Sequence, residues 1–142
     1  MKEPVYHYEI DQSSDEWFRL RLGIVTASEV KMLLTAGGKI ADNDTVRKYA
    51  YEKAAQRITN QIEDSYQSYD MVRGTMQEGI ARGYYNDSYE EVLECGFIVR
   101  DFGGFSIGAS PDGLCGDCGG IEIKSRLSKF QIKTIIDDEV PK

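Results

Sequence analysis

GGIEIKS, at residues 119–125, combines a glycine turn with a short alternating strand pattern. Side chains of a β-strand point to opposite faces in turn, so Ile121 and Ile123 are predicted to share one face. Glu122 and Lys124 then project together from the other face. The stretch therefore predicts a strand that places a carboxylate and an ammonium in one small site.

A second carboxylate precedes this strand, in SPDGL at residues 110–114. A short glycine-rich hairpin joins the two segments, so Asp112 is expected to approach Glu122 across the sheet. Two converging carboxylates suit Mg²⁺, which polarises a phosphate oxygen and helps to generate hydroxide. Lys124 could orient or deprotonate the attacking water, or stabilise charge in the transition state, and both roles stay open. Alone, Glu-x-Lys is typical of an ordinary surface pair.

Three short runs rich in β-forming residues predict an antiparallel meander, at residues 97–99, 105–107 and 121–124. Glycine pairs at 103–104 and 119–120 mark the breaks between them. Helices are predicted before and after these strands, so the expected fold is α/β, with N-terminal helices, a three-stranded antiparallel meander and a final helix.

The helices are predicted from capping patterns and apolar spacing. Capping patterns begin helices near Ser13 and Ala27, and Asp70 is a candidate cap for a later one. The predicted helical segments lie after Ser13, after Ala27, at 46–58, at 71–84 and at 128–136, with a polar connection at 61–68. Three glycines in one predicted helix, at 74, 79 and 83, suggest close packing or a backbone approached by a ligand.

Composition narrows the class of protein. The chain has 142 residues, one domain's worth, and no apolar run approaches the roughly 20 residues that cross a bilayer. A formal charge of −7 and a pI near 4.8 argue against a broad basic surface for nucleic acid, although one positive groove stays compatible. Three cysteines, an odd number, and an N-terminus without a secretory pattern predict a reducing cytosol.

Cys115 and Cys118 invite a metal interpretation because they are only three residues apart. A closed zinc or iron–sulfur site normally needs four ligands, and only Cys95 and the remote His7 remain. A hairpin loop of small residues is the preferred interpretation.

SPDGL followed by GGIEIKS resembles the Asp…Glu-x-Lys signature of the PD-(D/E)XK nucleases, which share a restriction-endonuclease-like core. The resemblance is strongest to the branch of the phage lambda exonuclease and the YqaJ-like viral recombinases. It implies one such domain over residues 1–142, with Asp112, Glu122 and the Ile123 main-chain carbonyl holding Mg²⁺, or Mn²⁺ in its place. Lys124 would serve the attacking water.

The resemblance extends upstream. WFRLRLGIVTASEV, at residues 17–30, is similar to the family's N-terminal motif and implies that Arg21 and Ser28 bind a DNA phosphate. Independently, Ser28 lies at a predicted helix N-terminus, where free N–H groups attract anions, and arginine can grip a phosphate with two hydrogen bonds. Without the family, a helix cap and a surface arginine explain these two residues equally well.

Two more acidic residues match the family. RGTMQE, at residues 73–78, resembles its Gly-x-x-x-Glu helix and implies that Glu78 assists at the metal. Asp101 matches an acidic residue near the family's site, but it also lies beside a turn, where aspartate is ordinary.

By resemblance, the function is 5′-to-3′ digestion of double-stranded DNA ends in phage-type homologous recombination. The implied partners are DNA ends, a single-strand annealing protein and two further copies in a homotrimer, without a membrane and in the cytoplasm of a bacterial host. The family continues beyond the segment that corresponds to Lys142, so the chain is expected to lack a C-terminal part of the family fold. A non-catalytic DNA-end-binding or inhibitory remnant is therefore the alternative, against which the intact Asp…Glu-x-Lys set speaks.

Overall fold

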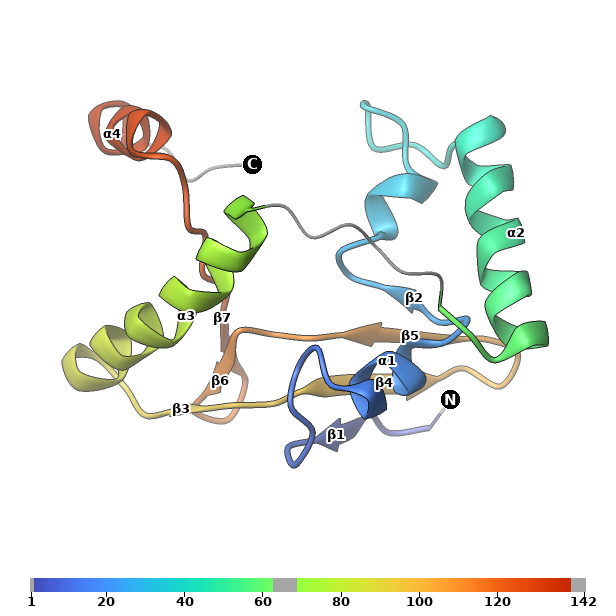
Figure 1. Ribbon diagram of the computed structural model, residues 1–142, viewed down its shortest axis with the longest axis horizontal. Coiled ribbons are helices and arrows are strands. Elements are labelled where there is room, and N and C mark those ends of the chain that lie inside the picture. The colour runs from blue at the N-terminus through green and yellow to red at the C-terminus, as the bar shows by residue number, and fades with distance from the viewer. Residues whose placement is uncertain (1, 63–68, 139–142) are drawn as a thin grey trace.

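A computed structural model describes residues 2–62 and 69–138, and it confirms the predicted α/β class (Figure 1). The elements are β1 (Val5–His7), α1 (Asp15–Arg21), β2 (Val25–Thr26), the 3-10 helix η1 (Val30–Leu33), α2 (Asp44–Thr59), α3 (Tyr69–Ser88), β3 (Val92–Leu93), β4 (Phe97–Asp101), β5 (Ser106–Ala109), β6 (Gly113–Cys115), β7 (Gly119–Ile121) and α4 (Ser128–Asp137).

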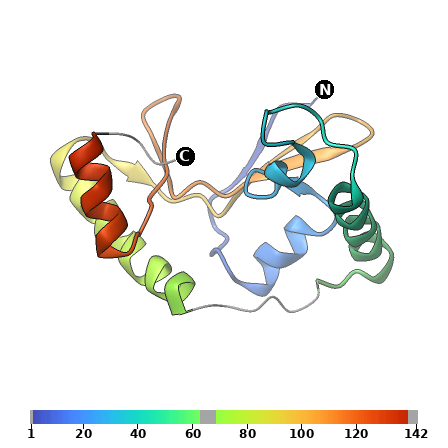
Figure 2. The same ribbon diagram turned by 90° about the horizontal axis from the view of Figure 1, so that it is seen from above.

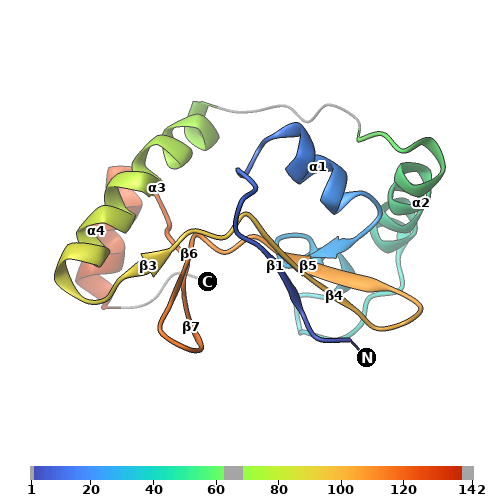
Figure 3. The same ribbon diagram turned by 90° about the horizontal axis from the view of Figure 1, so that it is seen from below.

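The strands form two sheets rather than one meander. The first has the order β1-β4-β5-β2, with β2 parallel to β5, and the second has the order β3-β6-β7 with antiparallel pairs. Helices α1 and α2 lie beside the first sheet, and α3 and α4 lie beside the second (Figures 2 and 3). The predicted single meander is therefore wrong. Pro111 stands between β5 and β6 and has no N–H to donate to a ladder, which is a reason for the break.

Helix α1 is capped one residue later than predicted. The Ser14 hydroxyl accepts from the Trp17 backbone N–H at 3.2 Å, whereas Ser13 has a left-handed φ of 68°. The Trp17 indole N–H donates to the Gly96 carbonyl at 3.0 Å and to the Ser110 hydroxyl at 2.9 Å. Gly96 precedes β4 and Ser110 follows β5, so these bonds hold α1 against the open end of the β4–β5 hairpin, the first hairpin of the chain.

The α-helix predicted near Ala27 is replaced by β2 and the four-residue 3-10 helix η1. The capping pattern is still partly realised, because the Glu29 carboxylate accepts from the Thr26 backbone N–H at 3.3 Å. The Ala27 N–H, however, donates to the Gly108 carbonyl at 2.9 Å and so continues the parallel pairing with β5. Pairing with the sheet therefore overrides the local preference for a helix.

Helices α2, α3 and α4 confirm three of the predicted segments. Asn43 caps α2, and the helix ends at Asn60 in a left-handed conformation with a φ of 55°. Helix α3 already includes Asp70, whose side chain lies outside the described residues, as does most of the connection predicted at 61–68. Apart from the neighbouring residues and backbone of α3 itself, a Cβ at any of its glycines (Gly74, Gly79, Gly83) would meet no atom of the described chain within 4 Å. The prediction of close packing there is wrong.

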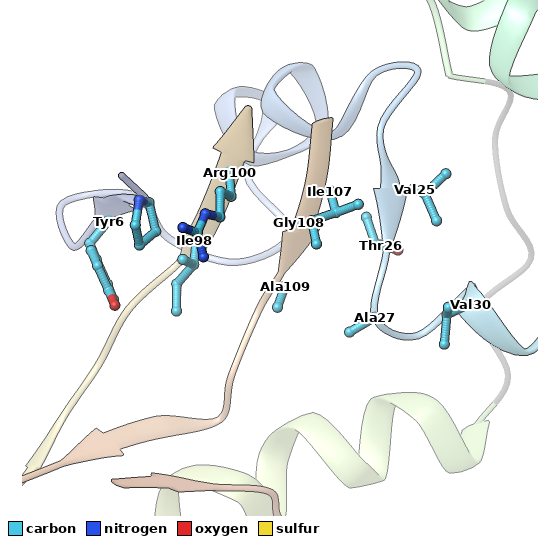
Figure 4. Close-up of a pocket in the computed structure, with 11 residues that line it drawn as sticks. Tyr6, Val25, Thr26, Ala27, Val30, Ile98, Arg100, Ile107, Gly108 and Ala109 are labelled. Atoms are coloured by element: carbon cyan, nitrogen blue, oxygen red, sulfur yellow. The ribbon is translucent and has the colours of Figure 1, made fainter. Parts of the chain in front are cut away.

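Among the described residues, few apolar side chains are buried, and they include residues of both sheets and of α2 (Ile10, Ala41, Tyr49, Cys95, Phe97, Cys115). Phe97 is fully buried, and its ring lies against the Gly108 backbone, where a Cβ would stand 2.1 Å from the ring's Cζ. The opposite face of the first sheet carries an apolar pocket of about 460 Å³, lined by Tyr6, Ile98 and Ile107 among others (Figure 4).

In the described ranges, no helix is both long and apolar enough to cross a membrane.

Candidate active site

A polar pocket of about 240 Å³ lies where α3 faces the start of β6, and it is distinct from the apolar pocket on the first sheet. Its charged lining includes Glu78 and Arg82 from α3, Glu94 after β3, and Asp112 before β6. Two of the residues predicted from the sequence, Glu78 and Asp112, are thus brought together here.

Asp112 is held from two sides. Its carboxylate Oδ2 accepts from the Ile123 backbone N–H, and its main-chain carbonyl accepts from Arg82 Nε at 2.8 Å. Burial raises the pKa of the Asp112 carboxyl, and the nearby negative charge of Glu122 raises it further, although the bond from Ile123 opposes both. The carboxylate therefore faces the segment that carries Glu122, as the sequence predicted.

Glu78 reaches the same region from α3. Its side chain is 25% exposed, and its Oε1 accepts from Arg82 Nη2 at 2.7 Å. Burial raises the pKa of the Glu78 carboxyl, the charge of Asp112 raises it further, and Arg82 opposes the shift. Both carboxylates are half-buried, and the charge of Asp112 adds to the burial that raises the pKa of Glu78. A cation placed beside them would favour their ionised forms.

Glu122 and Lys124 lie just beyond the end of β7 and form an ion pair with each other. Their side chains are 60% and 62% exposed, while Ile121 and Ile123 are half-buried, so the predicted alternation of faces is confirmed. Neither charged side chain lines the pocket of Glu78 and Asp112. The ion pair instead holds Glu122 toward Lys124.

The donor chemistry fits a hard divalent cation, since the candidate ligands are carboxylate and carbonyl oxygens. Burial is the main cause of both raised carboxyl pKa values, and a neighbouring carboxylate adds to each shift, Asp112 at Glu78 and Glu122 at Asp112. Across residues 2–62 and 69–138, however, no three His, Cys, Asp or Glu side chains are grouped closely enough to hold a metal ion. For Glu122 to join a cation site with Asp112, its side chain would have to leave Lys124 and turn toward Asp112.

Arg21 forms a second polar centre on the neighbouring sheet. Its guanidinium lies 4.0 Å from the Trp17 ring centroid, and its Nη1 donates to the Ser110 hydroxyl at 3.4 Å. Its Nη2 donates to the Thr26 hydroxyl at 3.4 Å, and Thr26 Oγ1 lies 3.2 Å from the Ser28 hydroxyl. Arg21 and Ser28 are thus gathered around Thr26, as expected of two groups that bind one phosphate.

The prediction that Ser28 lies at a helix N-terminus is wrong. Ser28 does not begin an α-helix, because η1 has four residues and its N-cap is Glu29. The hydroxyl and the nearby guanidinium remain as phosphate donors, without the contribution of a helix dipole. Burial lowers the pKa of the Arg21 guanidinium, while the charge of Glu29 raises it. This burial strengthens its attraction to an anion, since water screens the charge less.

Sequence patterns did not single out Glu29, the acid that supports this centre, as a functional residue. Glu29 Oε2 accepts from the Thr26 hydroxyl at 2.7 Å and from the Tyr49 hydroxyl at 3.2 Å, and its Oε1 pairs with Lys53 at 2.9 Å. Burial and the Glu29 charge raise the pKa of Tyr49, so this phenol stays a donor. Thr26, which gives its hydrogen to Glu29, is left to accept from Arg21. The only signal available was the capping pattern that ends at Glu29.

Asp101 is not brought to either centre. It ends β4 opposite Ser106, at the turn of the first hairpin, where it pairs with Lys2 at 2.8 Å and accepts from the Gly103 N–H at 2.7 Å. The polar pocket lies beyond the other end of this hairpin, past Ala109. Asp101 therefore serves the turn, which was the ordinary interpretation of its position. Cys115 and Cys118 lie in the β6–β7 hairpin and are free thiols.

Comparison with known proteins identifies the family. Residues 16–142 match the YqaJ-like viral recombinase domain. Two crystal structures of the alkaline exonuclease LHK-Exo, the first from Laribacter hongkongensis and the second in complex with dAMP, are 37% and 38% identical to the chain, each with a TM-score of 0.70. Each alignment covers 89% of this chain and 61% of the exonuclease, so the chain spans less than two thirds of its relatives' length. No curated protein matches.

The matched structures confirm the predicted nuclease-like α/β core, since they share it over most of the chain. With a family match over residues 16–142, the chain belongs to the YqaJ-like viral recombinase domain family.

Proposed function

We propose that this domain hydrolyses phosphodiester bonds of DNA as a metal-dependent exonuclease. The observation that carries the proposal is the half-buried pair Glu78 and Asp112, with raised carboxyl pKa values, beside the Glu122–Lys124 ion pair. Similarity to an alkaline exonuclease at 37% identity, and to the same enzyme in complex with dAMP, supports a nucleotide-containing substrate.

Arg21 and Ser28 are proposed to bind a backbone phosphate, with Trp17 as the flat support of the guanidinium. Ser110, which accepts from both Trp17 and Arg21, is separated from Asp112 by Pro111 alone. Two residues of extended chain span about 7 Å. The phosphate centre and the acidic pocket thus lie along one short stretch, and one DNA strand can contact both.

In the proposed mechanism, Asp112, Glu122 and the Ile123 carbonyl would hold Mg²⁺ or Mn²⁺, and Glu78 would assist. The bound ion would polarise the phosphate oxygen and lower the pKa of the attacking water. Lys124, once separated from Glu122, orients or deprotonates that water. Arg21 and Ser28 keep the substrate strand in place while the bond is cleaved.

The finer proposal is 5′-to-3′ digestion of double-stranded DNA ends, which leaves 3′ single strands for a partner annealing protein in phage-type recombination. Its support is the family itself, a viral recombinase domain. Assembly as a homotrimer and a place in the cytoplasm of a bacterial host belong to the same proposal.

Digestion of linear duplex DNA labelled at either the 5′ or the 3′ end tests the proposal. With Mg²⁺ present we expect early release of the 5′ label, no release in EDTA, and none from Lys124→Ala or Glu122→Gln. Asp101→Asn is the matched control, because Asp101 lies at the hairpin turn and pairs with Lys2. Retained binding to DNA ends without digestion by the unmodified chain would refute hydrolysis and favour a non-catalytic end-binding domain.

A further inference from the structure

Arg82 is the point at which three segments around the acidic pocket meet. It lies on α3, one turn after Glu78, and its side chain is only 16% exposed. Its Nη2 donates to Glu78 Oε1 at 2.7 Å, its Nε to the main-chain carbonyl of Asp112 at 2.8 Å, and its Nη1 pairs with Glu94 Oε1 at 2.7 Å. One guanidinium therefore joins α3 to the segments that follow β3 and precede β6.

We propose that Arg82 is a positioning residue, which sets Glu78 and Asp112 at the separation that a shared cation requires. The inference rests on the proposed function and adds a role for a residue outside the expected ligand set. Arg82 contacts neither DNA nor the ion in this account; it acts through the two acids.

The pattern of contacts leaves both acids able to bind. Arg82 bonds to one oxygen of Glu78, Oε1, and leaves Oε2 without a hydrogen bond to any residue that the structure describes. At Asp112 it takes the main-chain carbonyl and leaves the carboxylate untouched, while Ile123 N–H occupies Oδ2 from the other side. A residue that merely neutralised the pocket would pair with both carboxylates. This arrangement instead fixes the positions of the acids and leaves oxygens free.

The shape of the guanidinium matters as much as its charge. Arginine presents its donors in a rigid planar fork, whereas the lysine ammonium is a single point of charge on a flexible stem. The three partners of Arg82 come from residues 78, 94 and 112 and use three different nitrogens. A lysine at position 82 would keep the charge but could not hold Glu78 and the Asp112 carbonyl in the same geometry.

The decisive variant is therefore Arg82→Lys, measured in the whole chain without DNA first. Loss of a residue that orients metal ligands typically weakens metal affinity by about 10- to 100-fold. We expect the Kd for Mn²⁺, followed by electron paramagnetic resonance of the free ion, to rise by that factor. In the digestion assay, kcat at fixed Mg²⁺ should fall similarly while KM for DNA stays unchanged, because Arg21 and Ser28 bind the phosphate separately.

Arg47→Lys is the matched control, since Arg47 also bridges two acids, Asp42 and Asp44, each at 2.9 Å, but on the exposed start of α2. It should bind Mn²⁺ as the unmodified chain does. Circular dichroism checks that each variant is folded, and Arg82→Gln, which keeps one planar N–H donor group, serves as a second variant with the same expected loss.

The outcomes separate the two proposals. Unchanged Mn²⁺ affinity and kcat in Arg82→Lys, with an active unmodified chain, overturns the role of Arg82 alone. An unmodified chain that neither binds Mn²⁺ nor digests DNA overturns the proposed function and this inference with it. If both variants at position 82 lose their folded spectrum, Arg82 is a determinant of the fold and its positioning role is overturned.

Discussion

Replacement of Arg21 tests the phosphate centre most directly, because its charge and its shape can be removed separately. Arg21→Lys keeps the charge but loses the two-pronged grip and the flat contact with Trp17, now at 4.0 Å from the ring centroid. Arg21→Gln removes the charge as well. If Arg21 binds a backbone phosphate, the two variants differ in how their DNA affinity depends on salt.

The expected sizes follow from the surroundings of Arg21. A hydrogen bond to a charged group contributes about 1.5–3 kcal/mol. Ser28 beside it is exposed, so water reaches the centre and the lower end applies, which corresponds to about a tenfold rise in Kd for Arg21→Lys. Each phosphate contact contributes about 0.9 to the slope of log affinity against log salt, so between 50 and 200 mM salt the affinity of Arg21→Gln should fall about 3.5-fold less than that of the unmodified chain.

Fluorescence anisotropy with a blunt duplex in EDTA measures these affinities without hydrolysis. Arg47→Gln is the matched control, because Asp42 and Asp44 already neutralise that arginine. A salt slope in Arg21→Gln equal to that of the unmodified chain would show that Arg21 touches no phosphate. An equal slope in Arg21→Lys is expected, since the charge is kept.

Three further predictions concern stability. Gly108→Ala should lower the free energy of unfolding by about 1–3 kcal/mol in urea titrations, because its Cβ would stand 2.1 Å from the buried Phe97 ring. An unchanged urea midpoint would contradict the packing described. Burial opposes but does not cancel the bonds from Lys53 and Thr26, which hold the pKa of Glu29 below its ordinary 4.5. Ionised Glu29 therefore stabilises the fold above that value, and this contribution is lost as pH falls through its lowered pKa. Glu29→Gln should make the free energy of unfolding fall less steeply between neutral and acidic pH. An unchanged pH dependence would refute this prediction. Burial raises the pKa of Asp112, so its ionised form opposes folding as pH rises. Asp112→Asn should therefore abolish digestion yet increase the free energy of unfolding at neutral pH without metal. A lower free energy of unfolding would contradict the raised pKa.

Local patterns in the sequence predicted the parts of the site that depend on neighbouring residues. The alternation of Ile121, Glu122, Ile123 and Lys124 is a property of one extended segment, and the structure has it even though β7 ends at Ile121. Helices α2 and α4 likewise follow from apolar spacing over one or two turns. Such features need no knowledge of distant partners.

The rest depends on contacts that local patterns do not encode. Strand β2 has two residues, too few for a period, and it exists because Val25 and Thr26 pair with β5 some eighty positions later. Of the three partners of Arg82, only Glu78, four residues away on the same helix, was open to prediction. Glu94 and the Asp112 carbonyl reach it only through the tertiary fold.

Pro111 links the two centres in a way that bears on substrate choice. Its ring restricts φ, and its carbonyl accepts from the Gln12 side chain at 3.0 Å, so the link between Ser110 and Asp112 is stiff. On the proposed function, such a stiff link keeps the phosphate centre and the acidic pocket at a fixed distance, which suits the spacing between neighbouring phosphates of DNA. Backbones with longer or shorter linkages than natural DNA would then bind at one centre and be out of register at the other.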